Sequence, residues 1–220
     1  MIWCQPRGGF RARESEGGRR QGLEYTAMIM VADVRSAMAG FRPQLLPHQE
    51  DMKKAAVAAV LREGGEGAEL LFILRAEHPH DPWSGQMAFP GGRMDPADRD
   101  EMAAATRETL EEVALDLARE GEALGRLSDV AAVSRGRPLS LVIVPHVFAL
   151  RLTPQLVLNH EVAEAVWVPL SYLANYDNRS TLDWKLGNMT IPLPCYRLQD
   201  KVIWGLTFGM VDELLSILGR

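Results

Sequence analysis

The segment Arg107-Glu108-Thr109-Leu110-Glu111-Glu112 is the part of this chain that says most about its fold, because it packs three carboxylates into one short helical stretch. On an α-helix, residues three and four apart are neighbours, so Glu108, Glu111 and Glu112 project together. Like charges one turn apart destabilise a helix unless a cation offsets them. Mg2+ prefers oxygen ligands and commonly bridges carboxylates to phosphates. The segment therefore predicts a divalent metal site.

A glycine turn, Phe89-Pro90-Gly91-Gly92, lies shortly upstream of the carboxylates. Residues 91–115, GGRMDPADRDEMAAATRETLEEVAL, resemble the Nudix box, whose pattern is G-x5-E-x7-R-E-U-x-E-E-x-G-U with U aliphatic. Its R-E-x-x-E-E core is matched from Arg107 to Glu112. Two positions depart from the pattern: Arg99 stands at the first glutamate and Ala114 at the late glycine. Three nearby acidic residues are candidates to replace that glutamate: Asp98, Asp100 and Glu101.

The resemblance implies roles for the residues of this segment. It makes three glutamates the ligands of Mg2+ or Mn2+: Glu108, Glu111 and Glu112. Arg107 is expected to have a structural role, since its planar guanidinium can hold two carboxylates in fixed orientation. Gly91 and Gly92 let the backbone approach the metal and substrate closely. For the three glutamates alone, a solvated acidic helix face is the alternative.

Residues 70–100 resemble the extended signature of the coenzyme A pyrophosphatases within the Nudix family. Phe72 and Ala76 replace a Thr and a Ser of that signature, and a second Arg is missing. The resemblance places Arg75 and Trp83 near substrate, where Arg75 could bind a phosphate and Trp83 could stack on adenine. The alternatives are a surface arginine and a core indole. The positions that fit are Leu70, Leu71, Arg75, Gly85, Phe89, Pro90, Gly91 and Gly92.

The Nudix resemblance implies a general base either from the box itself or from a glutamate on a distant loop. Glu161 and Glu164 are the candidates, with Glu161 assigned as catalytic. Each also fits an ordinary surface glutamate. A base must lie within hydrogen-bond or one-water reach of the proton it accepts, and a sequence does not give that distance. His160, next to Glu161, fits a loop residue. His78 and His80 form no metal site without further ligands.

The composition excludes several classes of function. A net charge of -5 lacks the basic surface of a nucleic-acid-binding protein, so we expect no nucleic-acid partner. No run approaches the roughly 18 apolar residues that cross a bilayer, so we expect no membrane partner and a cytoplasmic protein. Cys4 and Cys195 have neither metal-ligand spacing nor a disulfide framework, and we expect one surface thiol and one half-buried thiol.

The pattern along the chain predicts an α+β fold, and the Nudix resemblance specifies an α/β/α sandwich with a mixed β-sheet and a loop-helix-loop motif. Residues 1–27 are polar and predict a disordered or loosely held tail, which leaves residues 28–220 as a single domain. Strands are expected at residues 55–61, 70–74, 139–150, 163–170 and 189–196, with Gly64-Gly65 turning between the first two and Pro145 at a bulge or edge. Helices are expected at residues 97–117, after Pro169 with Ser171 as cap, and at 204–218.

Together these patterns predict a Nudix pyrophosphohydrolase that uses Mg2+ or Mn2+ to split a phosphoanhydride bond in a small nucleotide. Coenzyme A or acyl-CoA is the expected substrate, giving 3',5'-ADP and 4'-phosphopantetheine. ADP-ribose, a nucleotide sugar or a nucleoside triphosphate is the alternative. A third possibility is a Nudix-fold module that binds a nucleotide without hydrolysing it. The chain is expected to be a monomer or a homodimer.

Overall fold

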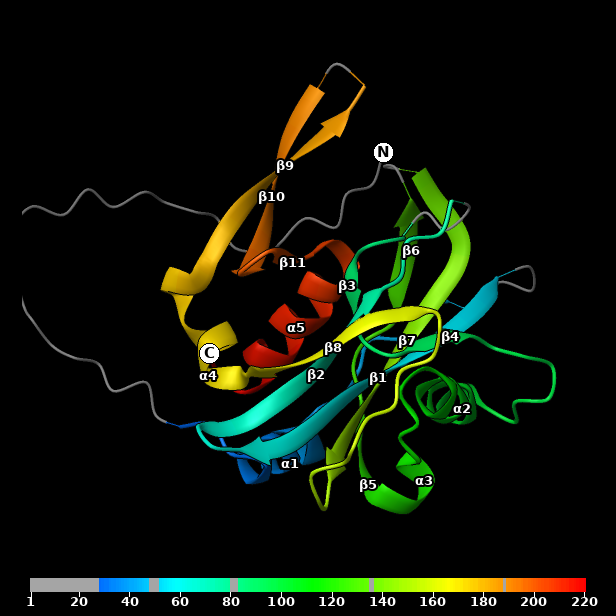
Figure 1. Ribbon diagram of the computed structural model, residues 1–220, viewed down its shortest axis with the longest axis vertical. Helices are drawn as coiled ribbons and strands as arrows, with labels where there is room; N and C mark the ends of the chain where they lie inside the picture. The colour runs from blue at the N-terminus through cyan, green and yellow to red at the C-terminus, as the bar shows by residue number, and fades with distance from the viewer. Residues whose placement is uncertain (1–27, 48–51, 80–82, 135–136, 188) are drawn as a thin grey trace, which may run out of the picture.

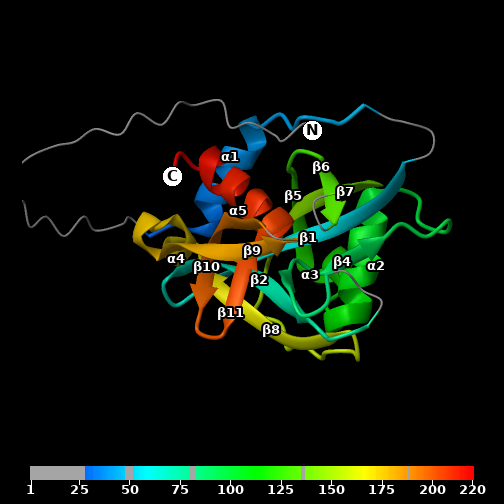
Figure 2. The ribbon, with the colours of Figure 1, turned by 90° about the horizontal axis from the view of Figure 1, so that it is seen from above.

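The structure is a computed structural model, and it describes residues 28–47, 52–79, 83–134, 137–187 and 189–220. An eight-stranded mixed sheet carries helices on both faces, and a three-stranded sheet lies at one end (Figure 1, Figure 2). The predicted α+β class, with a mixed sheet between helices, is confirmed. The expected tail, residues 1–27, lies outside the described residues, so the domain boundary at residue 28 stays a prediction.

The large sheet is built around β1 (Lys53–Gly64) and β7 (Arg137–Leu150), which run parallel to each other. β2 (Gly67–Arg75) pairs antiparallel with β1 across a short turn, as the two apolar runs predict. β8 (Val162–Pro169) pairs antiparallel with β2. Short strands complete the sheet: β3 (Met87–Ala88) on β2, β4 (Gly91–Arg93) on β1, and β5 (Gly121–Arg126) and β6 (Val130–Ser134) on β7.

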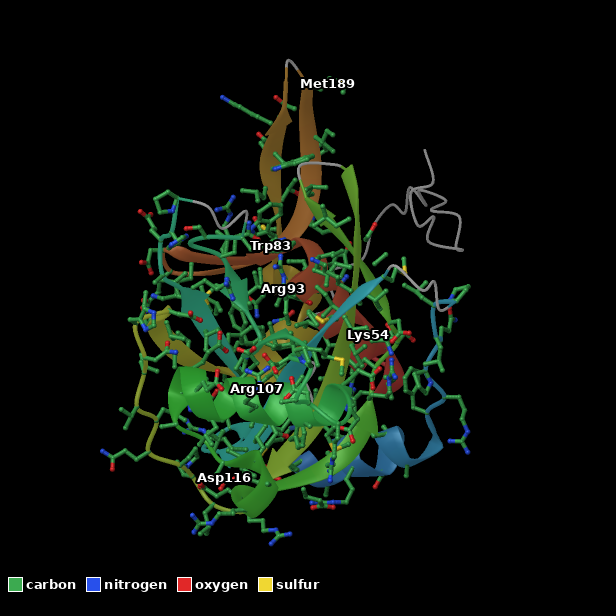
Figure 3. All side chains as sticks on the ribbon, turned by 90° about the vertical axis from the view of Figure 1, so that its right-hand side faces the viewer. Lys54, Trp83, Arg93, Arg107, Asp116 and Met189 are labelled. Carbon is green, nitrogen blue, oxygen red and sulfur yellow. The ribbon has the colours of Figure 1, made fainter. Side chains whose placement is uncertain are left out.

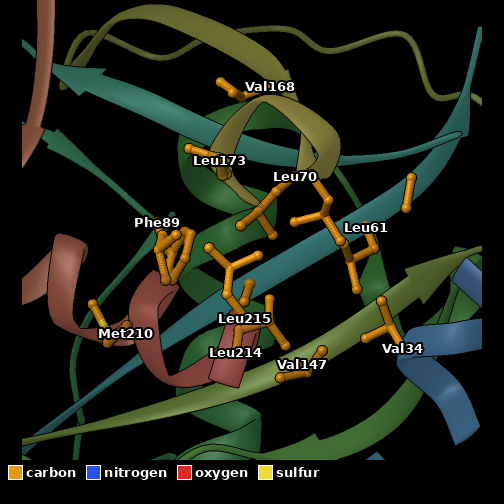
Figure 4. Close-up of a cluster of buried hydrophobic side chains, with 14 of the residues drawn as sticks. Val34, Leu61, Leu70, Phe89, Val147, Val168, Leu173, Met210, Leu214 and Leu215 are labelled. Carbon is orange, nitrogen blue, oxygen red and sulfur yellow. The ribbon is translucent and has the colours of Figure 1, made fainter. Parts of the chain in front are cut away.

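Each face of the large sheet has its own apolar core, because successive side chains of a strand point to opposite faces. Ala58 and Val60 of β1 lie in the cluster that packs under α2 and α3. Ala59 and Leu61 lie in the other cluster, which includes residues of α1, α4 and α5 (Figure 4). The result is the expected α/β/α sandwich. The helices are α1 (Val31–Gly40), α2 (Glu101–Val113), α3 (Leu117–Glu120), α4 (Leu170–Ala174) and α5 (Gly205–Ile217).

The helix that carries the carboxylates, α2, is shorter than the predicted range 97–117. It starts after Asp100, whose side chain accepts a hydrogen bond from the backbone N–H of Ala103 at 2.7 Å. This contact satisfies one of the free donors at the start of a helix. The helix ends at Val113, because Ala114 adopts a left-handed conformation, and Asp116 then caps the separate helix α3. The cap at Asp100 and the left-handed Ala114 therefore shorten the predicted range at both ends.

The C-terminal third forms the small antiparallel sheet, and its strands lie in the order β11-β10-β9. Its strands are β9 (Arg179–Leu186), β10 (Met189–Leu198) and β11 (Lys201–Trp204), which follow a 3-10 turn at Tyr176–Asn178. The predicted strand at 189–196 and the predicted closing helix at 204–218 are confirmed as β10 and α5. Among the described residues, no helix has the length and apolar character that crossing a membrane requires.

Other local predictions need correction. Ser171 is not a cap, because α4 already begins at Leu170, with Pro169 at the N-cap position and no side-chain cap bond. Cys195 is fully buried in β10 and not half-exposed, and Cys4 lies outside the described residues. Pro145, predicted at a bulge or an edge, lies inside β7, between the residues that pair with β5 and those that pair with β6. Its carbonyl accepts the N–H of Leu127 at 2.9 Å.

Candidate active site

Two glycines of β4 bring the backbone against α2. Gly91 has a φ of 146°, and a Cβ there would lie 2.3 Å from the carbonyl oxygen of Ala56, so only glycine fits. Its N–H donates a hydrogen bond of 2.8 Å to Oε2 of Glu112. At Gly92, a Cβ would lie 2.5 Å from the carboxyl carbon of Glu108. The glycine turn thus makes room for two of the three predicted carboxylates.

Glu112 is a buried carboxyl group, with 2% of the residue exposed. The pKa of Glu112 is raised to about 7: burial is the main cause, the charges of Glu108 and Glu161 add to it, and the bond from Gly91 and the charge of Arg75 oppose it. The guanidinium of Arg75, at the end of β2, lies 3.9 Å from Oε1 of Glu112. Arg75 is therefore a partly buried cation beside this carboxylate.

Arg107 lies on α2 (Figure 3) and is the centre of an ion-pair network. It bonds both oxygens of Asp98, at 3.1 and 2.9 Å, and contacts Glu108 at 3.0 Å and Glu111 at 3.2 Å. It also donates to the backbone carbonyl of Arg93 at 3.1 Å. These carboxylates raise the pKa of Arg107, and the bond from Arg107 lowers the pKa of Asp98. Arg107 thus fixes two of the predicted ligands and ties the helix to the preceding loop.

The three acidic residues near the position of the missing box glutamate have different partners. Asp98 binds Arg107, whereas Asp100 caps α2. Glu101 pairs with Lys54 of β1 at 2.5 Å. Asp98 is therefore the acidic residue that contacts the arginine of the box. Arg99 itself is exposed, with its guanidinium 3.2 Å from Asp100.

Glu161 lies in the electrostatic neighbourhood of the carboxylates. Burial raises the pKa of Glu108, the bond from Arg107 opposes this, and the charges of Glu111 and Glu161 add to the increase. The backbone carbonyl of Glu161 accepts the N–H of Ala76 at 2.8 Å, which places it next to the end of β2. Its side chain is about half exposed. Four carboxylates therefore repel one another in this region.

The other predicted base has a different environment. Glu164 forms an ion pair of 2.8 Å with Lys201 of β11, and this contact raises the pKa of that lysine. His160 is almost fully exposed, 4.0 Å from Glu161. Of the two glutamates, Glu161 is the one that influences the carboxylates of α2.

The residues present fit a divalent cation by their chemistry, although the described residues hold no preformed group of three His, Cys, Asp or Glu side chains arranged around one point. The carboxylate of Glu111 is directed to Arg107, and an oxygen of Glu112 is directed to Gly91. Burial and mutual repulsion raise the pKa values of Glu108 and Glu112, which is the imbalance that a bound cation offsets.

A family model described as NUDIX domain matches residues 52–186, more than half of the chain. The chain belongs to the Nudix family. A solved structure with this fold is that of a MutT/nudix family protein from Enterococcus faecalis, with a TM-score of 0.51 and 18% identity, covering 86% of this chain and 68% of that one. This likeness concerns the fold.

Curated relatives include further Nudix proteins. A Nudix hydrolase named NudL from Shigella sonnei is 30% identical over 201 residues, 90% of this chain and 98% of that protein. The human protein named mitochondrial coenzyme A diphosphatase NUDT8 is 31% identical over 153 residues, 68% of this chain and 62% of that protein. The chain also matches 32% of an uncharacterized Schizosaccharomyces pombe protein, at 39% identity over 107 residues. It thus spans less than two thirds of the human and yeast relatives.

The remaining positions of the Nudix signatures can be placed in the structure. Ala114, where the box has glycine, adopts the left-handed conformation with φ 56° and ψ 32°, so the end of α2 has the geometry that glycine usually supplies. Trp83 is partly buried against a small cluster that includes Ala55, Ala132 and Leu141, and its stacking role stays a prediction. His80 lies outside the described residues.

No pattern in the sequence predicts two backbone contacts of the site. In one, Arg107 donates to the carbonyl of Arg93, and in the other, the N–H of Ala76 donates to the carbonyl of Glu161. Both depend on loop paths, which side-chain patterns do not report.

Proposed function

We propose that this chain is a Mg2+- or Mn2+-dependent hydrolase that cleaves the phosphoanhydride bond of coenzyme A or acyl-CoA. Water attacks phosphorus and the bridging P–O bond breaks. The products are 3',5'-ADP and 4'-phosphopantetheine, or 3',5'-ADP and S-acyl-4'-phosphopantetheine when acyl-CoA is the substrate. The observation that carries the proposal is the set of carboxylates on α2 against Gly91 and Gly92, with the cation of Arg75 beside them. The name of the human relative, a coenzyme A diphosphatase, supports the substrate.

Glu108, Glu111 and Glu112 would hold the metal, which when bound supplies Lewis-acid charge stabilisation and an activated water. The protein's own part is orientation. The Gly91 N–H fixes one oxygen of Glu112, and Arg107 holds Glu108 and Glu111 through one guanidinium. Oxygens fixed before substrate arrives need no reorganisation during reaction.

Arg75 and Glu161 are proposed to act on the substrate side. The guanidinium of Arg75 is suited to bind a phosphate oxygen, because it forms charge-assisted hydrogen bonds in a planar fork. Glu161 would accept the proton of the attacking water, since it is partly exposed and lies close enough to raise the pKa values of Glu108 and Glu112. A general base contributes typically about 10²–10⁴-fold to a rate. Trp83 is proposed to contact the adenine.

A substrate panel tests this proposal. Coenzyme A, ADP-ribose, a nucleotide sugar and a nucleoside triphosphate are each incubated with the full chain and Mg2+ or Mn2+, and products are separated by chromatography. We expect 3',5'-ADP from coenzyme A and no product after chelation with EDTA. Turnover of the other nucleotides alone would reassign the substrate. Tight nucleotide binding without phosphate release would make the chain a binding module.

Glu111→Gln tests the site itself. We expect a loss of several orders of magnitude in kcat/KM, because removing a ligand disables every function of the metal together. Glu66→Gln is the matched control, since Glu66 is exposed in the turn between β1 and β2. An unchanged rate in Glu111→Gln would reject the assignment of these glutamates.

A further inference from the structure

The hairpin of β9 and β10 projects from the body of the protein, and one of its two strands is an unpaired edge strand. In the order β11-β10-β9, strand β9 is at the edge, and within the described ranges no strand pairs with its free side. The hairpin rises away from the large sheet, with Met189 at its tip (Figure 1, Figure 3). An exposed edge presents unpaired N–H and C=O groups that readily pair with another chain.

The opposite edge of the same hairpin is blocked by prolines. β10 carries Pro192 and Pro194, which lie opposite Asp183 and Thr181 of β9. A proline cannot donate to a ladder, so these are the non-hydrogen-bonded pairs, whose backbone groups face away from each other. The pairing of β11 ends at Cys195, so the two prolines lie on the part of β10 that β11 leaves uncovered. Strand addition is therefore disfavoured on that side.

The same alternation identifies the backbone groups that β9 offers on its free side. They belong to Asp183 and Lys185, because residues in non-hydrogen-bonded pairs point their N–H and C=O groups outward. Thr181 has the same orientation, but its carbonyl oxygen already accepts a hydrogen bond of 3.1 Å from the guanidinium of Arg197. All three residues are exposed, and β9 contains no proline. The hairpin thus has one blocked edge and one open edge.

We propose that the open edge binds β9 of a second copy of this chain, antiparallel about a two-fold axis at Trp184. In this register, Asp183 lies opposite the partner's Lys185, and Lys185 lies opposite the partner's Asp183. Opposite charges in directly facing positions stabilise a strand pair, and like charges destabilise it. The two neighbouring two-fold registers place Asp183 opposite itself or Lys185 opposite itself. Charge therefore selects the register centred on Trp184.

The monomer leaves these groups available for that partner. Across the part of the chain that the structure describes, neither Asp183 nor Lys185 belongs to an ion pair, whereas the neighbouring Arg179 is bound to Asp212. An isolated two-stranded hairpin is marginally stable in water. Pairing two copies joins the two three-stranded sheets into one sheet of six strands, and a C2 interface uses the same patch on both subunits. A projecting hairpin with a self-complementary edge is therefore suited to pair with a second copy of itself.

Charge reversal on the full chain tests this interface. We expect the mass from sedimentation equilibrium to be twice the 24.4 kDa of one chain. Asp183→Lys alone, or Lys185→Asp alone, opposes like charges twice and should weaken dimerisation by about tenfold or more. An equimolar mixture of the two variants restores both attractive pairs and should form dimers again, as should the double reversal in one chain.

The control is Glu66→Lys, which changes the net charge by as much as Asp183→Lys but lies in the turn between β1 and β2, and it should dimerise like the wild type. Wild-type chain that stays monomeric at about 100 μM would overturn the proposal, since specific interfaces reach micromolar affinity. A dimer that withstands both single reversals would equally overturn it. Monomers whose outward β9 amides are protected from hydrogen exchange would also overturn it, since the edge would then be covered without a second copy.

Discussion

Replacing Gly92 by alanine separates the chemistry of the site from the stability of the fold. The new Cβ would lie 2.5 Å from the carboxyl carbon of Glu108, whereas ordinary contact begins at 3.4 Å. Glu108 must therefore retreat by about 0.9 Å, the difference between these two distances. Because the clashing atoms are at the free end of a flexible side chain, and Gly92 does not have a left-handed φ, the fold can absorb the change.

The carboxylate cannot absorb that shift without effect on catalysis, since a displacement of about 1 Å can cost about 10²-fold in rate. We expect Gly92→Ala to lower kcat/KM for coenzyme A by about 10²-fold while its urea midpoint changes little. Both quantities are measured on the same preparation, by product chromatography and by circular dichroism. Wild-type activity in Gly92→Ala would refute the assignment of Glu108 to the site.

Gly91→Ala, unlike Gly92→Ala, should mainly lower the stability of the fold. A Cβ at Gly91 meets backbone atoms of Ala56 and Val57 at 2.3 and 2.5 Å, and its φ of 146° is strained for any other residue. Overpacking and backbone strain together should lower the free energy of unfolding by about 3 kcal/mol or more. Gly65→Ala is the control for both, because no atom lies within 4 Å of its Cβ position.

Two further changes test the ends of α2. Ala114→Gly should raise the free energy of unfolding by about 0.5–1 kcal/mol, because Ala114 is held at a positive φ. Ala103→Gly, inside the helix, should instead lower it by about 1 kcal/mol. Urea denaturation of both variants measures these changes, and a destabilised Ala114→Gly would contradict the reasoning. Arg107 lowers the pKa of Asp98, so ionised Asp98 stabilises the fold above its ordinary pKa and loses this effect as the pH falls through its folded pKa. Asp98→Asn should therefore destabilise by about 2 kcal/mol at pH 7 and by progressively less below about pH 4, and a constant difference would contradict the pairing.

The elements that the sequence predicts well are those whose periodicity is local. The apolar runs on either side of Gly64-Gly65 become β1 and β2, because alternating burial and a tight turn are both readable from adjacent residues. The helix at 31–40 is not among the predicted elements, although its three buried residues, Val31, Val34 and Met38, have the i, i+3, i+7 spacing of one helix face. Three apolar positions in a ten-residue segment are a weak pattern, and α1 is stabilised mainly by packing against β1 and β5.

The site shows the same division. Helical spacing predicts that Glu108, Glu111 and Glu112 share one region, but it does not predict that Glu112 is buried while Glu111 stays exposed beside Arg107. That difference comes from β4, which passes over one side of the helix and donates the N–H of Gly91. Spacing alone therefore identifies the carboxylates, and packing determines the burial and orientation of each.

The charges of the site explain why so many carboxylates can be close together in the folded chain. Arg107 contacts Glu108, Glu111 and Asp98, so one guanidinium offsets part of the charge of three carboxylates. Among the described residues, the cation paired with Glu112 is Arg75, at 3.9 Å, and the pKa of Glu112 is raised to about 7, mainly by burial. Uncompensated negative charge therefore remains on α2 beside the glycine turn. A divalent cation would relieve most repulsion at that point, which is also where a diphosphate could reach it.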